Sequence, residues 1–151
     1  MDGQQTLSRR VALAGGGALI AVSLAPAGAA ADAMENAIRE WTGGAKVNEG
    51  RVALDVAPLV ENGNSVALNV AAGEALTPER HVSAIAVFNE KNPQPLVAVF
   101  HLGPRTGRAS VSTRIRLADS QRITAIARMN DGSYWSDSAD VIVTLAACIE
   151  N

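Results

Sequence analysis

The sequence predicts an antiparallel β-sandwich preceded by one short helix. Beyond residue 50, apolar residues alternate with polar ones over most of the chain, and turn residues interrupt the pattern at regular intervals. No β–α–β alternation and no glycine-rich phosphate loop occur. Short strands at such spacing are typical of an all-β sandwich. Residues 30–151 are long enough for one domain with a sizeable core.

The helix is expected over residues 32–42. Its apolar positions recur at helical spacing: Met34, Ile38 and Trp41. Asp32 is a candidate N-cap, and Gly43-Gly44 is expected to end the helix. We expect the apolar stripe to pack on the domain itself; a helix that faces a partner is the alternative.

The strands follow the period-two pattern. They are expected at 52–56, 66–70, 81–88, 96–102, 109–117, 121–129, 134–135 and 141–145. Pro58 and Glu61-Asn62-Gly63-Asn64 interrupt the first two, and Asn130-Asp131-Gly132-Ser133 predicts a hairpin. Because residues 141–145 are apolar on both faces, we expect them to form a buried strand.

The N-terminal segment predicts export. Arg9-Arg10 precede a mild apolar run, and small residues around Ala29 suit cleavage, which are the features of a signal peptide. The apolar run is too short to span a bilayer. The paired arginines favour the twin-arginine route, which moves folded proteins, over an ordinary secretory signal. We therefore expect a twin-arginine-type signal at residues 1–29, a periplasmic location, and no membrane attachment after cleavage.

Charge and composition exclude several classes of function. Residues 30–151 carry 11 basic and 14 acidic residues, a formal charge of −3, which gives no indication of nucleic-acid binding. No catalytic motif or metal-ligand spacing is present, so we predict no catalytic residue, metal or cofactor. A small metal or redox chaperone would have to use scattered ligands: His81, His101, Met129 and Cys148.

The single cysteine is the most informative residue for function. Cys148 stands three residues before the end of the sequence. Because it is the only cysteine, an exported chain cannot form an internal disulfide. Its thiol is then buried and inert, bonded to another molecule, or reactive. Burial would carry Glu150 and Asn151 with it at a high desolvation cost, so we expect an accessible thiol.

Arginines are concentrated in one stretch of the sequence. Six of the 11 basic residues lie there: Arg105, Arg108, Arg114, Arg116, Arg122 and Arg128. Arg114 and Arg116 are expected on one face of a strand, because residues i and i+2 point the same way. Arginine forks bind oxyanions and carboxylates, so these two are candidates for anion or partner docking; a solvated sheet face is the alternative.

Several blocks, in order, resemble the SoxY family of the thiosulfate-oxidising (Sox) system. The resemblance covers nearly the whole of the chain after the signal. The blocks are Val60–Val66, Phe88–Pro93, Phe100–Pro104, Ser112–Gln121, Asp131–Ser133 and Val141–Cys148.

The resemblance implies an immunoglobulin-like sandwich that pairs with a SoxZ-like subunit, which is exported together with it. It also implies that residues 30–145 form the domain and that residues 146–151 form a carrier arm. In the family, a sulfur intermediate is carried on the cysteine of a Gly-Gly-Cys-Gly-Gly arm. Here Ala146 and Ala147 precede Cys148, and Ile149 and Glu150 follow it. This departure points to a related subgroup with an Ala-Ala-Cys-Ile-Glu arm, whose stiffer residues would not fit a tunnel shaped for glycine.

Two hypotheses of different class follow. In the first, the protein is a periplasmic carrier without turnover of its own, which holds a sulfur species covalently on Cys148 for partner enzymes. In the second, it is a non-catalytic interaction subunit whose cysteine is structural or forms an intermolecular disulfide, including a disulfide-linked homodimer. The chemical state of Cys148 separates the two.

Overall fold

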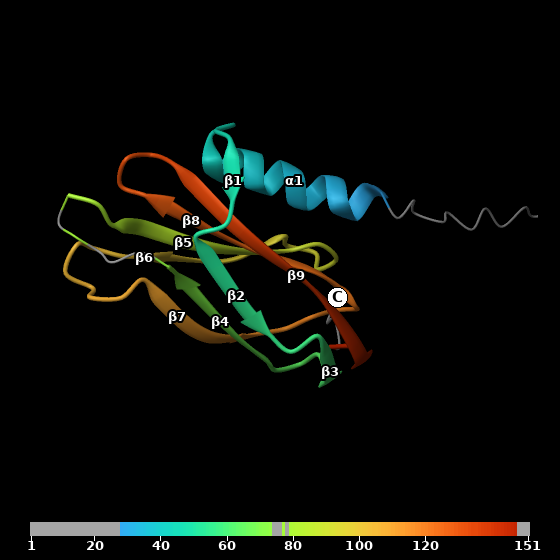
Figure 1. Cartoon of the computed structure of the whole chain (residues 1–151). Coiled ribbons are helices and arrows are strands. Elements are labelled where there is room, and N and C mark those ends of the chain that lie inside the picture. Colours follow the sequence, from blue (N-terminus) through green and yellow to red (C-terminus); the bar gives the residue numbers. More distant parts are fainter. Residues whose placement is uncertain (1–27, 74–76, 78, 148–151) are drawn as a thin grey trace, which may run out of the picture.

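The computed structural model describes residues 28–73, 77 and 79–147, with side chains from residue 31 onward (Figure 1). One helix, α1 (Gly28–Thr42), precedes nine strands. The strands are β1 (Val47–Glu49), β2 (Val52–Val56), β3 (Leu59–Asn62), β4 (Val66–Ala72), β5 (Val82–Asn89), β6 (Leu96–His101), β7 (Ser110–Ile115), β8 (Gln121–Met129) and β9 (Tyr134–Leu145). Within the described residues, no helix is both long and apolar enough to cross a membrane.

The strands form two sheets, as the alternating pattern predicted. The large sheet has the order β1-β9-β8-β5-β6, with β3 also paired to β9. The small sheet has the order β2-β4-β7 and lies across the large one (Figure 1). Most neighbours are antiparallel, whereas β1 and β3 pair with β9 in parallel. The predicted sandwich class is therefore confirmed.

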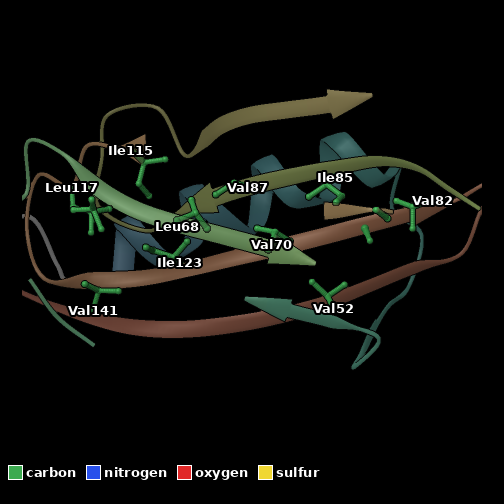
Figure 2. Close-up of a cluster of buried hydrophobic side chains, with 14 of the residues drawn as sticks. Val52, Leu68, Val70, Val82, Ile85, Val87, Ile115, Leu117, Ile123 and Val141 are labelled. Atoms are coloured by element: carbon green, nitrogen blue, oxygen red, sulfur yellow. The ribbon is translucent and has the colours of Figure 1, made fainter. Parts of the chain in front are cut away.

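The main core lies between the two sheets (Figure 2). In β4 the alternation is regular, with Val66, Leu68 and Val70 buried and the residues between them exposed. These side chains meet Ile85 and Ile123, on β5 and β8 of the large sheet, and both are fully buried. Burial of such aliphatic side chains contributes about 1.5–3 kcal/mol each and holds the layers together.

Helix α1 covers the outer face of the large sheet. Trp41 meets Phe88 and Tyr134 edge-on, with ring centroids 6.1 and 5.5 Å apart. Met34 and Ile38 join the same cluster, so the stripe packs on the domain itself. The helix thus forms a third layer, and a second hydrophobic core lies between it and the large sheet.

The ends of α1 differ in how well they were predicted. The helix begins at Gly28, so Asp32 lies inside it and the predicted N-cap is wrong. The expected end is confirmed, because Gly43 and Gly44 have positive φ values of 64° and 79°. The Gly44 amide donates to the carbonyl of Arg39 across 2.8 Å, which closes the last turn.

Three strands differ from the expected pattern. The residues expected as two strands, 134–135 and 141–145, belong to one continuous strand, β9. Strands β1 and β3, which are only three and four residues long, were not predicted. Each is held by parallel pairing with β9, far along the chain, and a local pattern carries no sign of such pairing.

The expectation that 141–145 is a buried strand is wrong. Val141 is buried, but Ile142 and Leu145 are 60% and 63% exposed. Here β9 has passed the end of its pairing with β8 and continues beside β3. Leu59 of β3, the register partner of Ile142, is also exposed, at 59%. Leu59 and Ile142 therefore form an exposed apolar patch on neighbouring strands, while Leu145 is exposed at the end of β9, on the opposite side of the strand from Ile142.

Candidate functional site

The segment before Cys148 is tied to the domain by two backbone hydrogen bonds, and a third hydrogen bond joins the two groups that hold it. The amide of Ala147 donates to the carbonyl of Leu117 across 3.0 Å. The amide of Gly63 donates to the carbonyl of Leu145 across 2.8 Å, and the amide of Leu117 donates to the carbonyl of Gly63 across 2.9 Å. Gly63, Leu117 and Ala147 therefore form a backbone network, here called the tail anchor.

Gly63 is required in the tail anchor because of its small size. A Cβ atom there would lie directly against the carbonyl oxygen of Leu117 and within 2.9 Å of the Ala147 nitrogen. Both are backbone atoms, which cannot rotate away as a flexible side chain would. The sequence pattern predicted only a turn at this glycine and no role at the site.

The predicted arm is described only over its first two residues. Ala146 is exposed, whereas Ala147 is 7% exposed and belongs to the tail anchor. The other predicted arm residues, Cys148, Ile149 and Glu150, lie outside the described residues. The chain is thus held against the domain up to the residue that precedes the cysteine.

The loop that contains Leu117 is held in place by the turn between β5 and β6. The side-chain amide of Asn92 donates to the carbonyl of Arg116 across 2.8 Å, and its oxygen accepts from the Ala118 amide across 3.0 Å. Gln121 donates to the same oxygen and accepts from the Lys91 amide. Side-chain hydrogen bonds of Asn92 and Gln121 therefore hold the loop that carries the Leu117 part of the tail anchor.

An ion pair also links the β5–β6 turn to this loop. Lys91 Nζ lies 3.3 Å from a carboxylate oxygen of Asp119. The Ser120 amide, which donates to the other oxygen, and Lys91 together hold the pKa of Asp119 below its ordinary value. Both side chains are largely exposed, so the pair contributes little to stability.

A pocket of about 420 Å³ opens at this end of the sandwich. It is bounded by the end of β5, the following turn, the start of β6 and the loop after β7. Its lining residues are Asn89, Asn92, Pro93, Gln94, Leu96, Val97 and Arg116. Asn89 is fully buried, and among the described residues neither its amide nitrogen nor its oxygen has a hydrogen-bond partner. An unsatisfied buried amide costs about 1–3 kcal/mol, so a position of this kind needs an explanation.

The structure separates the two candidate docking arginines. Arg114 lies on β7 and donates to the Ser65 hydroxyl across 3.3 Å. Arg116 lies just beyond β7 and lines the pocket. The predicted shared face thus divides into two different environments.

Two further arginines of the basic stretch are engaged elsewhere. Arg122 forms an ion pair with Asp140 at 3.0 Å, and the Arg128 guanidinium lies 5.9 Å from the centre of the Trp41 ring. The six arginines therefore do not form one surface, although they are close in sequence.

The two histidines were candidate metal ligands, together with Met129 and Cys148; Cys148 lies outside the described residues. His81 precedes β5, and His101 ends β6. Among the residues that the structure describes, no three histidine, cysteine, aspartate or glutamate side chains are placed to hold a metal ion.

The comparisons with known proteins identify the family. The model of the family described as "Sulfur oxidation protein SoxY" matches residues 38–148. The chain therefore belongs to the SoxY family, as the sequence blocks indicated. No curated protein sequence matches it.

Solved structures share the fold. The sulfur carrier protein SoxY from Chlorobium limicola f thiosulfatophilum has a TM-score of 0.64 at 24% identity, over 76% of this chain and 94% of that one. A superoxide reductase (neelaredoxin) from Ignicoccus hospitalis has a TM-score of 0.55 at 14% identity, over 61% and 78%. A putative superoxide reductase from Thermotoga maritima gives 0.54 at 21% identity, over 65% and 92%. At these identities the structural matches show the fold alone.

Proposed function

We propose that this protein is a periplasmic sulfur carrier that holds a sulfur intermediate covalently on Cys148. The observation that carries the proposal is that the family match runs as far as residue 148, directly after the tail anchor. An anchored residue beside a reactive group limits where that group can be offered to a partner. The protein then acts as a carrier and docking surface rather than as an enzyme.

The chemistry at Cys148 is that of a thiolate nucleophile. Coupling the thiolate to the outer sulfur of thiosulfate forms one S–S bond and releases two electrons, which an electron-accepting partner protein takes up. Hydrolysis of the terminal sulfonate by another partner releases sulfate and leaves a persulfide on the cysteine. These steps belong to the partner enzymes, and the carrier supplies the sulfur atom to which the cargo is bound.

Export by the twin-arginine route is part of the proposal. Residues 1–29, which hold the signal, lie almost wholly outside the described residues, so the support is the pattern of Arg9-Arg10 and the small residues near Ala29. The route carries folded proteins, which suits export of this sandwich already bound to a SoxZ-like subunit.

The arm defines a subgroup of carriers. Ala147 is buried in the tail anchor, and alanine is small enough to fit there. Ile149 and Glu150 replace the glycines that follow the cysteine in the usual arm. Enzymes that serve this carrier must therefore accept a branched and a charged side chain beside the cargo.

The SoxZ-like subunit is proposed to cover the apolar patch of Leu59 and Ile142. Among the described residues these are two of the few exposed large hydrophobic side chains, and they are register partners on β3 and β9. The Ile142→Thr variant should fold normally but bind the subunit at least tenfold more weakly. Thr144→Ser, on the same strand, is the control. Equal binding by the Ile142 variant would place the partner elsewhere.

The mass of the intact protein from the periplasm, measured with and without reductant, tests the carrier proposal. Additions equal to sulfur atoms, sulfite or thiosulfate, removable by reductant and absent from Cys148→Ser, are expected. A clean thiol that resists alkylation in the folded protein would contradict it.

The second candidate, a non-catalytic interaction subunit, is favoured by the same exposed patch of Leu59 and Ile142. It predicts that Cys148→Ser binds its partner and supports full sulfur oxidation in cells. The carrier proposal predicts normal binding with loss of that activity.

A further inference from the structure

We propose that the pocket between the β5–β6 turn and the β7 end is a binding site for a small oxyanion, with Arg116 and Asn89 as its recognition groups. That the anion is a sulfur oxyanion rests on the proposed carrier function. The binding of an oxyanion as such rests on the pocket alone.

The direction of the Asn89 side chain follows from the register. Asn89 is paired with Ile123 across β5 and β8, and directly paired residues point to the same face of a sheet. Ile123 belongs to the core between the sheets, as does Val87, two residues before Asn89. The Asn89 amide therefore faces the space between the sheets, at the end where the pocket opens.

The side-chain amide of Asn89 makes no hydrogen bond among the described residues. Its neighbour in the pocket, Asn92, has its amide nitrogen bonded to Arg116 and its oxygen bonded to Ala118 and Gln121. The Asn89 side chain is buried, and neither polar atom has a partner among the described residues. Apolar residues of equal size would stabilise such a position better if it had only a packing role.

The chemistry of the lining favours an anion. Arg116 is exposed, and its guanidinium makes no hydrogen bond or ion pair within the described part of the chain. Its five N–H donors suit a planar or tetrahedral oxyanion. None of the lining residues in the described part of the chain is acidic, and Leu96 and Val97 form an apolar wall that strengthens a charge-assisted hydrogen bond. We expect the Asn89 nitrogen to donate to the anion, while its oxygen accepts from an accompanying water.

The pocket also lies beside the tail anchor. Arg116 is adjacent in sequence to Leu117, whose carbonyl accepts the hydrogen bond from Ala147, the residue before Cys148. The anion has two possible sources: a free ion, or the terminal sulfonate of a species bound to Cys148. Both present the same oxygen chemistry to the pocket.

Binding of a free ion is tested on Cys148→Ser, in which no covalent cargo can form. Isotope-labelled protein is titrated with thiosulfate, sulfite and sulfate at constant ionic strength, with chloride as the reference salt. Saturable NMR shifts are expected at the side-chain NH₂ of Asn89 and the Nε–H of Arg116. Asn89→Leu and Arg116→Gln should each weaken binding at least tenfold. Arg108→Gln, which removes an exposed charge outside the pocket, should not.

The stability of Asn89→Leu separates binding from structure. A binding role predicts an unchanged or raised melting temperature, because an unsatisfied buried amide is replaced by an apolar group. A lowered melting temperature with unchanged ion binding would show that Asn89 has a structural role and would overturn the proposal. If this variant fails to fold, Arg116→Gln and the shifts in the parent protein still decide the question. The absence of saturable shifts would also overturn it.

The source of the anion is tested on the protein with Cys148 intact. Protein sulfonated on Cys148 is compared with protein carrying a neutral methylthio group there. If the cargo occupies the pocket, only the sulfonated form shows the Asn89 shifts without added salt, and it no longer binds free ion. If both forms bind free ion equally, the pocket serves free oxyanions. Failure of the carrier proposal would instead appear as a Cys148 without adducts in the periplasmic protein, whatever the pocket binds.

Discussion

The amide of Ala147 donates a hydrogen bond to the carbonyl oxygen of Leu117 across 3.0 Å, and Gly63 lies against both of these backbone groups. Residue 147 closes the tail anchor, and the only cysteine of the chain follows it. The hydrogen bonds link the β3–β4 turn, the loop after β7 and the end of β9. Three segments that are far apart in sequence thus determine where the proposed carrier arm leaves the domain.

A methyl group at Gly63 should loosen this anchor. Gly63→Ala is expected to cost about 1–3 kcal/mol in the free energy of unfolding, because the new Cβ collides with backbone atoms of Leu117 and Ala147. Denaturant unfolding measures the loss, and hydrogen exchange at the Ala147 amide should become faster. Gly103→Ala is the matched control, since a Cβ there meets nothing within 4 Å. Equal stability of the two variants would argue against the close packing.

The carboxylate of Asp137 should help to join the two sheets. One of its oxygens, on β9, accepts a hydrogen bond from the Leu54 amide of β2 across 2.9 Å. Asp137→Ala leaves this partly buried donor without a partner and should destabilise the fold by about 1–3 kcal/mol. Asp137→Asn keeps an acceptor oxygen and should lose less. Calorimetry on both variants measures the difference, and an equal loss in both would assign the effect to charge instead of the hydrogen bond.

Trp41 should hold α1 on the large sheet. Trp41→Ala removes the edge contacts with Phe88 and Tyr134 and is expected to cost about 3 kcal/mol. Faster amide exchange throughout α1 is the specific sign. Trp135→Ala, which removes the contact of Arg51 over the Trp135 ring, should leave exchange in α1 unchanged. Slow exchange in α1 of the Trp41 variant would show that other contacts hold the helix.

Acid should weaken the fold through carboxylates whose pKa is lowered by hydrogen bonds. Arg122 lowers the pKa of Asp140 below its ordinary value of 3.8, and the hydroxyl and amide of Ser133 do the same for Asp131. A lowered pKa in the folded state means that the stabilisation is present above 3.8 and is lost as the pH falls through the folded value. We expect a small drop in the melting temperature below about pH 4 from these groups and none from them between pH 5 and 8.

Two variants test the Asp140 part of this dependence. Asp140→Asn removes the titrating group, and Arg122→Gln removes the cause of its shift. Both should show a shallower fall of the melting temperature with acid than the parent protein. An unchanged acid profile in both would show that the exposed pair adds nothing to stability, as for many surface ion pairs.

Local patterns were enough to predict much of the fold. Alternation placed Val66, Leu68 and Val70 in the core, and helical spacing predicted the face of α1 that carries Trp41. The sequence blocks also indicated the family that the family model confirms. The buried face of a helix or strand depends on the spacing of apolar residues within that element, so it can be predicted from the sequence alone.

The site was less accessible to prediction. Asn89 lies on the inward face of β5, as its register with β8 shows. Its proposed role in binding depends on a pocket that it lines together with Arg116, which follows β7 and is distant in sequence. Gly63 carried the weak signal of a glycine between two asparagines, and only the packing of Leu117 and Ala147 shows why a side chain is excluded. Ile142 looked like a core residue because its own strand is apolar, yet in the described chain only the opposite face of β9, with Val141 and Val143, packs on the core.

The sequence by itself determined the class of fold, the family and the single thiol available for chemistry, because periodicity, composition and residue identity are local properties. Tertiary structure decided where the chain before Cys148 is held, which arginine lines a pocket, and which apolar side chains are left exposed. These depend on contacts between segments that are distant in sequence, such as β3 with β9 and the Asn92 turn with the loop after β7. Only the folded chain brings such segments together.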